Sequence, residues 1–206
     1  MTKRGKLVIL VGIDGGGKST LLSSLEEKGY FISHWKKLKS FSLPKPLNFK
    51  NPAEVVQTLK GEKRLKFIWE YINSEWEYLI RPNLETDRNV ISEGFFIRFF
   101  IKEKIYKRLP IKKFLKQSPL KGNELIIMVD TPPEIALKRK IKSKISPYEC
   151  FETPQDFVYF QRLQRKFLLE FIKSFPHIII NGMLPKATLI KEVLIKLKEN
   201  QIEPMS

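Results

Sequence analysis

Short runs of apolar residues alternate along the chain with longer segments whose apolar positions recur every three to four residues. The runs have the length of buried strands, and the longer segments are typical of helices that bury one side. Strands that alternate with helices favour parallel βαβ units, in which a helix connects each strand to the next. The predicted strands cover residues 7–11, 29–35, 89–92, 125–129 and 177–181.

Three helix starts are indicated by side chains that can accept a hydrogen bond from the first backbone amides. Residues 51–54 (Asn-Pro-Ala-Glu) and 153–156 (Thr-Pro-Gln-Asp) each combine a cap, a proline at the first helical position and an acid three residues after the cap. Residues 131–134 (Thr-Pro-Pro-Glu) begin a basic helix that runs toward Lys144. Residues 36–50 have the composition of a basic surface loop.

The segment 65–79 is apolar around most of its circumference if it is helical. Such a helix is usually buried on more than one side. Two interpretations remain open: both stripes pack within one subunit, or one of them forms a homodimer interface. One stripe consists of Leu65, Ile68, Trp69, Ile72, Trp76 and Leu79, and the other of Phe67, Tyr71 and Tyr78.

The length and composition fit a single folded domain over residues 1–206. The chain has one cysteine, Cys150, and two histidines, so an internal disulfide is excluded and no spacing for a closed zinc site is present. The apolar run after the basic amino terminus is interrupted by Asp14, and no other run approaches the roughly 20 apolar residues of a spanning helix. We expect a cytoplasmic protein without a membrane segment.

The charge balance is strongly basic, with 38 Lys and Arg against 22 Asp and Glu. A net charge of +16 implies a partner or substrate that carries negative charge. Nine basic residues and one acidic residue lie between Gly94 and Lys121, and five basic residues lie between Lys138 and Lys144. Aromatic residues are interleaved with the cations over 95–107, which also suits stacking of nucleic acid bases.

Residues 12–20 read Gly-Ile-Asp-Gly-Gly-Gly-Lys-Ser-Thr, directly after the first predicted strand and directly before a helical pattern. The sequence matches G-x-x-x-x-G-K-[ST], the phosphate-binding P-loop. Glycines let backbone amides converge on phosphate oxygens, and the helix that follows points its positive end at the same anion. Lys18 is expected to span the β- and γ-phosphates and Ser19 to hold Mg²⁺. The predicted fold is therefore a three-layer α/β P-loop fold with a five-stranded parallel sheet flanked by helices.

Five segments of the chain resemble parts of the thymidylate kinases. The loop 12–20, with an Asp two residues after its first glycine, is similar to the opening of that family, and residues 129–139 resemble its Asp-x-Pro-Pro turn and lid-entry helix. Residues 151–152 and 160–167 resemble the helix after the lid, and 181–182 the turn that contacts adenine. The resemblance implies Mg-ATP as phosphoryl donor, a nucleoside monophosphate as acceptor, and a basic lid around 138–152.

The resemblance also assigns roles to individual residues. Arg139 is the first candidate for a contact to the transferred phosphoryl group, with the solvated face of a charged helix as the alternative. Asp14 meets the acceptor sugar hydroxyl, or stabilises the loop through a hydrogen bond to its own backbone. The predicted donor-binding residues are Gly12, Asp14, Gly15, Gly16, Gly17, Lys18, Ser19, Thr20, Asn181 and Gly182.

The acceptor side departs from the family at the end of the third predicted strand. Thymidylate kinases have Asp-Arg and an aromatic residue there, whereas this chain reads Glu93-Gly94-Phe95, so the arginine that grips the acceptor phosphate is missing. Glu93 is expected to bind Mg²⁺ or to orient the acceptor. Arg98 reaches back toward the site if residues 95–101 are helical. Phe67 is close to the position of the base-stacking aromatic, with a core role as the alternative.

Three functional hypotheses follow from these observations. The first is a Mg-ATP-dependent kinase that converts a nucleoside monophosphate, thymidylate by family default, to the diphosphate. The second is a P-loop kinase whose acceptor is a nucleoside or another small metabolite, which the glycine at position 94 favours. The third is a nucleic-acid-associated protein that retains ATP binding with degenerate kinase activity.

Overall fold

A computed structural model describes residues 5–34, 58–106, 119–142 and 153–204. Its centre is a five-stranded sheet in the order β2-β3-β1-β4-β5, and every neighbouring pair of strands is parallel. This is the predicted α/β arrangement, with β1 in the middle. The strands are β1 (Leu7–Val11), β2 (Phe31–Ser33), β3 (Val90–Glu93), β4 (Leu125–Asp130) and β5 (His177–Asn181).

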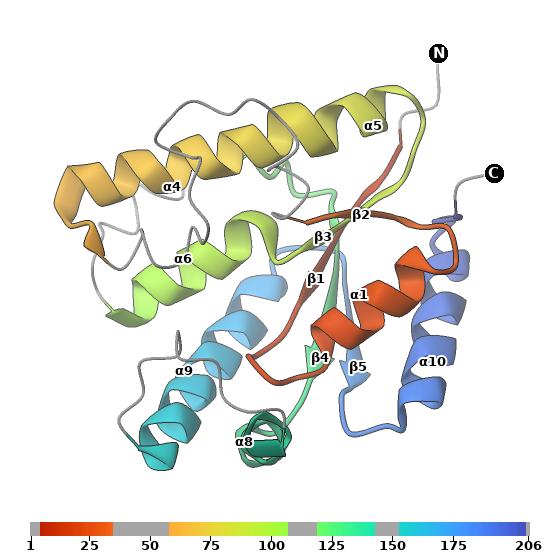
Figure 1. Cartoon of the computed structure of the whole chain (residues 1–206). Helices are drawn as coiled ribbons and strands as arrows, with labels where there is room; N and C mark the ends of the chain where they lie inside the picture. The colour runs from red at the N-terminus through yellow and green to blue at the C-terminus, as the bar shows by residue number, and fades with distance from the viewer. Residues whose placement is uncertain (1–4, 35–57, 107–118, 143–152, 205–206) are drawn as a thin grey trace.

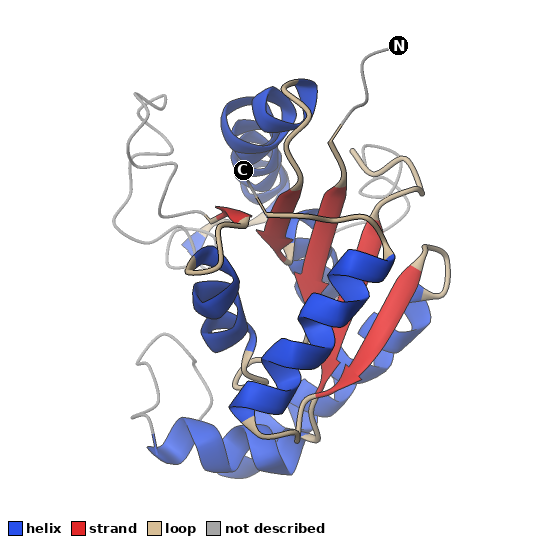
Figure 2. Cartoon of the chain, turned by 90° about the vertical axis from the view of Figure 1, so that its right-hand side faces the viewer, coloured by secondary structure: helices blue, strands red, loops and turns tan. Residues whose placement is uncertain are grey.

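Helices cover both faces of the sheet, as Figures 1 and 2 show. α1 (Lys18–Glu26) and α10 (Lys186–Glu199) pack on one face. The other face carries α4 (Gly61–Glu75), α6 (Phe95–Tyr106) and α9 (Pro154–Ile172), while α8 (Pro133–Lys142) follows β4 and contacts α9. The predicted three-layer fold is therefore confirmed.

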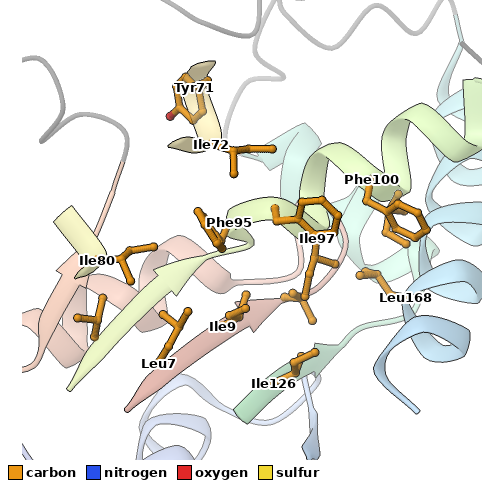
Figure 3. Packing of buried hydrophobic residues seen from close by; sticks show 14 of the residues in the cluster. Leu7, Ile9, Tyr71, Ile72, Ile80, Phe95, Ile97, Phe100, Ile126 and Leu168 are labelled. Carbon is orange, nitrogen blue, oxygen red and sulfur yellow. The ribbon is translucent and has the colours of Figure 1, made fainter. Parts of the chain in front are cut away.

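The alternation of side chains along β1 divides the core into two clusters. All five residues of β1 are buried, which matches a central parallel strand with helices on both faces. Leu7 and Ile9 point toward α4, α6 and α9, and Figure 3 shows them beneath Phe95 and Ile97. Val8 and Leu10 belong to the cluster under α1 and α10. The sheet is thus held rigidly from both sides.

The structure corrects several predicted boundaries. The second strand covers only 31–33 of the expected 29–35, and the third and fourth each extend one residue further at their carboxyl ends, to Glu93 and Asp130. Thr153 and Asp156 form the expected capping box at the start of α9. The helix start at 51–54, the basic loop 36–50 and Lys144 lie outside the described residues.

The apolar segment 65–79 lies in α4 and in the π-helical turn η2 (Trp76–Ile80), which continues into α5 (Arg81–Glu85). Members of both predicted stripes pack in one cluster of the same subunit, including Phe67, Ile68, Tyr71 and Ile72. Tyr78 is 42% exposed. These contacts explain the apolar circumference without a second subunit, and the homodimer stays a prediction.

The described part of the chain contains no helix that is both long and apolar enough to cross a membrane.

Candidate active site

The glycine-rich loop 12–17 connects the end of β1 to α1 and has the backbone geometry of an anion cradle. Gly12, Gly15 and Gly17 have φ angles of 154°, 79° and 96°, which side chains disfavour. Gly17 is the N-cap of α1, and no side chain caps the first amides of that helix. These free amides can donate hydrogen bonds to a phosphate, and the helix dipole favours negative charge at the same end.

Lys18 is the first residue of α1, and its ammonium group folds back onto the loop. Nζ donates a hydrogen bond to the Ile13 carbonyl oxygen at 2.7 Å. Burial lowers the pKa of Lys18 below its usual value, and the nearby Lys102 and Lys140 lower it further, whereas Asp14 and Glu93 oppose the shift. The ammonium group therefore lies at the loop, where a phosphate oxygen could replace the Ile13 carbonyl oxygen as its hydrogen-bond acceptor.

The loop is bonded by two side chains, one directly after β4 and one in α9. The Thr131 hydroxyl donates to the Gly16 carbonyl oxygen at 3.1 Å, and the Gln161 side-chain oxygen accepts from the Asp14 amide at 3.0 Å. Both side chains are almost fully buried. Sequence reasoning missed these two residues, and only the position of Thr131 directly after a strand was a usable signal. Both bonds attach the loop to neighbouring parts of the fold.

Arg139 joins the P-loop to the turn after β5. Its guanidinium donates to the Gly182 carbonyl oxygen at 2.9 Å and, with a longer separation of 3.4 Å, to the Gly16 carbonyl oxygen. The turn itself is close-packed, because a Cβ on Gly182 would lie 1.9 Å from the Thr131 hydroxyl oxygen. The structure therefore brings the predicted phosphate-binding and adenine-binding segments together. In this conformation Arg139 contacts main-chain carbonyls, and its role in transfer stays a prediction.

Asp14 projects from the loop toward α6 and pairs with Lys102, whose Nζ lies 3.6 Å from Oδ2. Burial alone raises the pKa of Asp14, but Lys102, Lys18 and Lys140 together hold it at about 2. The carboxylate is ionised at neutral pH and faces three ammonium groups. This surplus of positive charge suits a polyphosphate substrate.

Glu93 ends β3, at the edge where the carboxyl ends of β1 and β3 meet. Its carboxylate lies 3.3 Å from His34 Nε2. Burial raises the pKa of Glu93, but the hydrogen bond from His34 and the charges of Lys18 and Arg98 outweigh that effect and lower it. Glu93 is thus close enough to the P-loop lysine for the two charges to interact, and its expected role toward Mg²⁺ or the acceptor stays a prediction.

Arg98 reaches back to the carboxyl end of β3, because residues 95–101 are helical as the prediction required. Its guanidinium donates to the Glu93 carbonyl oxygen and to a Glu75 carboxylate oxygen, each at 3.4 Å, and lies 5.2 Å from the centre of the Tyr71 ring. The arginine side chain also covers Gly94, whose Cβ would meet that of Arg98 at 3.1 Å. Arg98 thus occupies the space beside the glycine.

Glu75 is the centre of a buried polar cluster that sequence reasoning did not identify. It is 1% exposed and accepts hydrogen bonds from the hydroxyls of Ser33 and Ser92 at 2.9 and 2.8 Å, in addition to the bond from Arg98. Ser33 ends β2 and Ser92 lies in β3. Glu75 therefore ties the carboxyl ends of two strands to α4 and α6.

Two aromatic side chains near the predicted acceptor side, Phe67 and Phe100, lie in the core. Phe67 is 5% exposed within the hydrophobic core, which favours the packing alternative over base stacking. Phe100, in the neighbouring helix α6, is also buried and stacks on Phe96. The lid positions 143–152 and the basic residues 107–118 lie outside the described residues. The nucleic-acid interaction therefore stays a prediction.

The residues at this edge suit a magnesium ion shared with a nucleotide. The described residues include no group of three or more His, Cys, Asp and Glu that could hold a metal by themselves. Mg²⁺ in phosphoryl-transfer sites keeps several waters and takes only one or two protein ligands besides phosphate oxygens. The hydroxyl of the exposed Ser19, in the first turn of α1, and the carboxylate of Glu93 would be the oxygen ligands of such an ion.

Comparison with known proteins identifies relatives by sequence. The chain is 33% identical over 155 residues to the thymidylate kinase of Leptospira borgpetersenii, which covers 71% of this chain and 73% of that protein. It is 30% identical over 160 residues to the thymidylate kinase of Leptospira interrogans, and this alignment covers 73% of this chain and 76% of that protein. The thymidylate kinase of Dinoroseobacter shibae is 28% identical and aligns with 96% of this chain and 98% of its own. No protein-family model matches the chain.

Solved structures confirm the fold. A deoxyadenosine kinase from M. mycoides, with the products dCMP and dCDP bound, superposes with a TM-score of 0.61 at 18% identity and covers 94% of this chain and 99% of its own. The same enzyme with dATP bound gives a TM-score of 0.61 at 17% identity. With the sequence relatives, these structures identify a P-loop nucleotide kinase. The chain belongs to the thymidylate kinase family.

Proposed function

We propose that the protein transfers the γ-phosphoryl group of Mg-ATP to a nucleoside monophosphate, with thymidylate as the acceptor. The observation that carries the proposal is the uncapped start of α1 with Lys18 folded onto the loop beside it. Such a site binds the phosphates of a nucleotide through backbone amides and one ammonium group. The curated relatives named thymidylate kinase support thymidylate as the acceptor.

The donor occupies the side of β1 on which β4 and β5 lie. Residues 12–20 hold its phosphates, Asn181 and Gly182 contact the adenine, and Ser19 and Glu93 hold Mg²⁺. A magnesium ion held by these two residues would supply charge neutralisation for the phosphates. Phosphoryl transfer requires positioning and charge neutralisation more than covalent chemistry, because negative charge spreads over the oxygens of the transferred group. Lys18 and the first amides of α1 supply that neutralisation from the protein.

The acceptor approaches from the side of β3 and β2. Asp14 accepts a hydrogen bond from its sugar hydroxyl, and Arg98 contacts it from α6. Orientation of the acceptor is the alternative role of Glu93, and its lowered pKa keeps the carboxylate ionised at neutral pH for either role. Phe67 stacks on the base only if α4 repacks, because it lies in the core.

A nucleoside acceptor is the second candidate, and a specific observation favours it. Position 94 has no side chain, and the Arg98 guanidinium is already engaged by the Glu93 carbonyl and the Glu75 carboxylate. An acceptor without a phosphate needs no further cation on this side. The two candidates therefore differ in whether the acceptor carries a phosphate.

An ADP-release assay with Mg-ATP and a panel of acceptors separates the candidates. We expect turnover with thymidylate, and none with the Lys18→Ala variant. Lys28→Ala is the matched control, since this exposed lysine follows the other end of α1 and its removal leaves the rate unchanged. Turnover with thymidine or deoxyadenosine but with no monophosphate selects the second candidate. Absence of turnover with every acceptor contradicts both.

A further inference from the structure

α6 presents two cations toward the acceptor side of the P-loop. Arg98 and Lys102 are four residues apart, so they lie on the same side of the helix. Arg98 reaches the Glu93 carbonyl oxygen at the end of β3, and Lys102 Nζ lies 3.6 Å from the carboxylate of Asp14 in the loop after β1. The two side chains thus line the carboxyl ends of neighbouring strands.

The orientation of α6 is fixed by its other side chains. Glu103 is 1% exposed and forms a bidentate ion pair with Arg64 of α4, with contacts of 2.5 and 2.9 Å. Lys104 points to α9, where its Nζ lies 4.1 Å above the Phe167 ring and 3.6 Å from a carboxylate oxygen of Glu170. The buried ion pair of Glu103 with Arg64 is the contact that holds the helix in this orientation, with Lys102 on the side of the P-loop.

Among the described residues, three ammonium groups act on the carboxylate of Asp14, and a second carboxylate, Glu93, acts on Lys18. Asp14 faces Lys18 and Lys140 as well as Lys102, and their combined charge depresses its pKa to about 2. One donor of Arg98, the buried Nε, has no hydrogen-bond partner among the residues that the structure describes. A substrate anion near Arg98 and Lys102 would neutralise this positive surplus.

The strand order indicates which substrate supplies that anion. Arg139 and Lys140 approach the loop from α8, which follows β4, and Arg139 also contacts the turn after β5. Lys102 approaches from α6, which follows β3 on the opposite side of β1. Figure 1 shows α6 and α8 as separate elements that flank the loop between β1 and α1. With Asn181 and Gly182 as the adenine-binding turn proposed above, the donor nucleotide would lie nearer α8 and the acceptor nearer α6.

We propose that Lys102 is an acceptor-binding residue and that, together with Arg98, it binds a phosphate group of the acceptor. The inference rests on the phosphoryl transfer proposed above and narrows its acceptor to a phosphate monoester. Because position 94 is a glycine, α6 supplies the cations that the end of β3 lacks. Lys102 shares its ammonium group between Asp14 and the acceptor phosphate when the acceptor is bound.

Calorimetric and kinetic measurements on variants of Lys102 test the proposal. Lys102→Met removes the charge and keeps most of the side-chain length, and Lys102→Arg keeps the charge. Lys104→Met is the matched control on the other side of the same helix. The Lys102 side chain is 46% exposed, so its replacement is expected to leave the fold intact.

We expect Lys102→Met to weaken thymidylate binding roughly 10- to 100-fold, the range for loss of one charge-assisted hydrogen bond. ATP binding and the binding of thymidine, which has no phosphate, stay at the wild-type level. Lys102→Arg restores most of the affinity for thymidylate, and Lys104→Met resembles the wild type. This combination separates phosphate recognition from a general structural effect.

Three results overturn the proposal. In the first, Lys102→Met binds thymidylate as tightly as Lys104→Met does. In the second, it weakens ATP binding as much as thymidylate binding, and in the third, it weakens thymidine binding as much as thymidylate binding. If the wild type transfers phosphate to thymidylate and any of these occurs, the assignment of Lys102 fails and the proposed function stands. If the wild type binds no monophosphate at all, the proposed function and the assignment of Lys102 both fail.

Discussion

Arg139 is the residue for which the sequence and the structure suggest different roles, and its replacement distinguishes them. The sequence predicts a contact to the transferred phosphoryl group, whereas the structure bonds its guanidinium to the Gly182 and Gly16 carbonyl oxygens. These bonds link the turn after β5 to the phosphate loop. On the contacts observed, we predict that Arg139→Met chiefly weakens ATP binding, because the two parts of the donor site lose their connection.

The magnitude follows from the two distances. The 2.9 Å bond to Gly182 is of ordinary length, but the 3.4 Å bond to Gly16 is long, so only the first is counted. A hydrogen bond from a charged donor contributes roughly 1.5–3 kcal/mol. Since about 1.4 kcal/mol corresponds to a factor of ten in affinity, the Kd for ATP rises roughly 10- to 100-fold.

Calorimetric titration with Mg-ATP gives the Kd, and single-turnover kinetics at saturating ATP give the rate of transfer. Lys28→Met is the control, because this exposed lysine follows the far end of α1 and lies outside the lid. A contact made only in the transition state lowers the rate and leaves the Kd unchanged. If Arg139→Met keeps the wild-type ATP affinity but shows a large fall in rate, Arg139 contacts the transferred phosphoryl group and does not chiefly hold the donor site together.

Three further predictions concern stability, pH and metal. Glu103→Ala leaves the buried Arg64 guanidinium without its counter-charge and lowers the free energy of unfolding by roughly 3–5 kcal/mol; a change below about 1 kcal/mol in urea unfolding contradicts this. The pKa of Asp14 lies at about 2, below its value in the unfolded chain, so the ionised carboxylate stabilises the fold at neutral pH. This stabilisation, on the order of 2 kcal/mol, is lost as the pH falls from about 4 to about 2. Urea unfolding of Asp14→Asn should lack that acid dependence, and an unchanged profile speaks against it. Ser19→Ala raises the Mg²⁺ concentration for half-maximal turnover, whereas an unaltered metal dependence excludes Ser19 as a ligand.

The donor half of the site was predictable because its chemistry is local in the sequence. The phosphate loop needs a strand, several glycines, a lysine and a helix start within about a dozen residues, as the P-loop motif requires. The capping box at Thr153 is equally local and was confirmed. The sheet followed from the alternation of apolar runs and helical patterns, and only strand ends were misplaced, because burial of an end residue depends on its neighbours.

The acceptor half was not predictable in the same way, because its contacts join residues far apart in the chain. Glu75 lies in a helix and bonds to Ser33 and Ser92 from two separate strands. Gln161 fixes the amide of Asp14 across 147 positions. No spacing rule marks such residues, since their proximity arises only when the helices pack on the sheet. The helical reach of Arg98 was the one acceptor-side feature that a local rule predicted.

Titration of Mg-ATP into the purified protein tests directly whether residues 12–20 bind the phosphates of a nucleotide, on which the proposed kinase activity depends. We expect a saturable heat signal with one nucleotide bound per chain, which is lost in Lys18→Ala while the melting temperature of that variant stays close to the wild-type value. No measurable heat with the folded wild-type protein, or equal binding by Lys18→Ala, would contradict the assignment of residues 12–20 as the donor site.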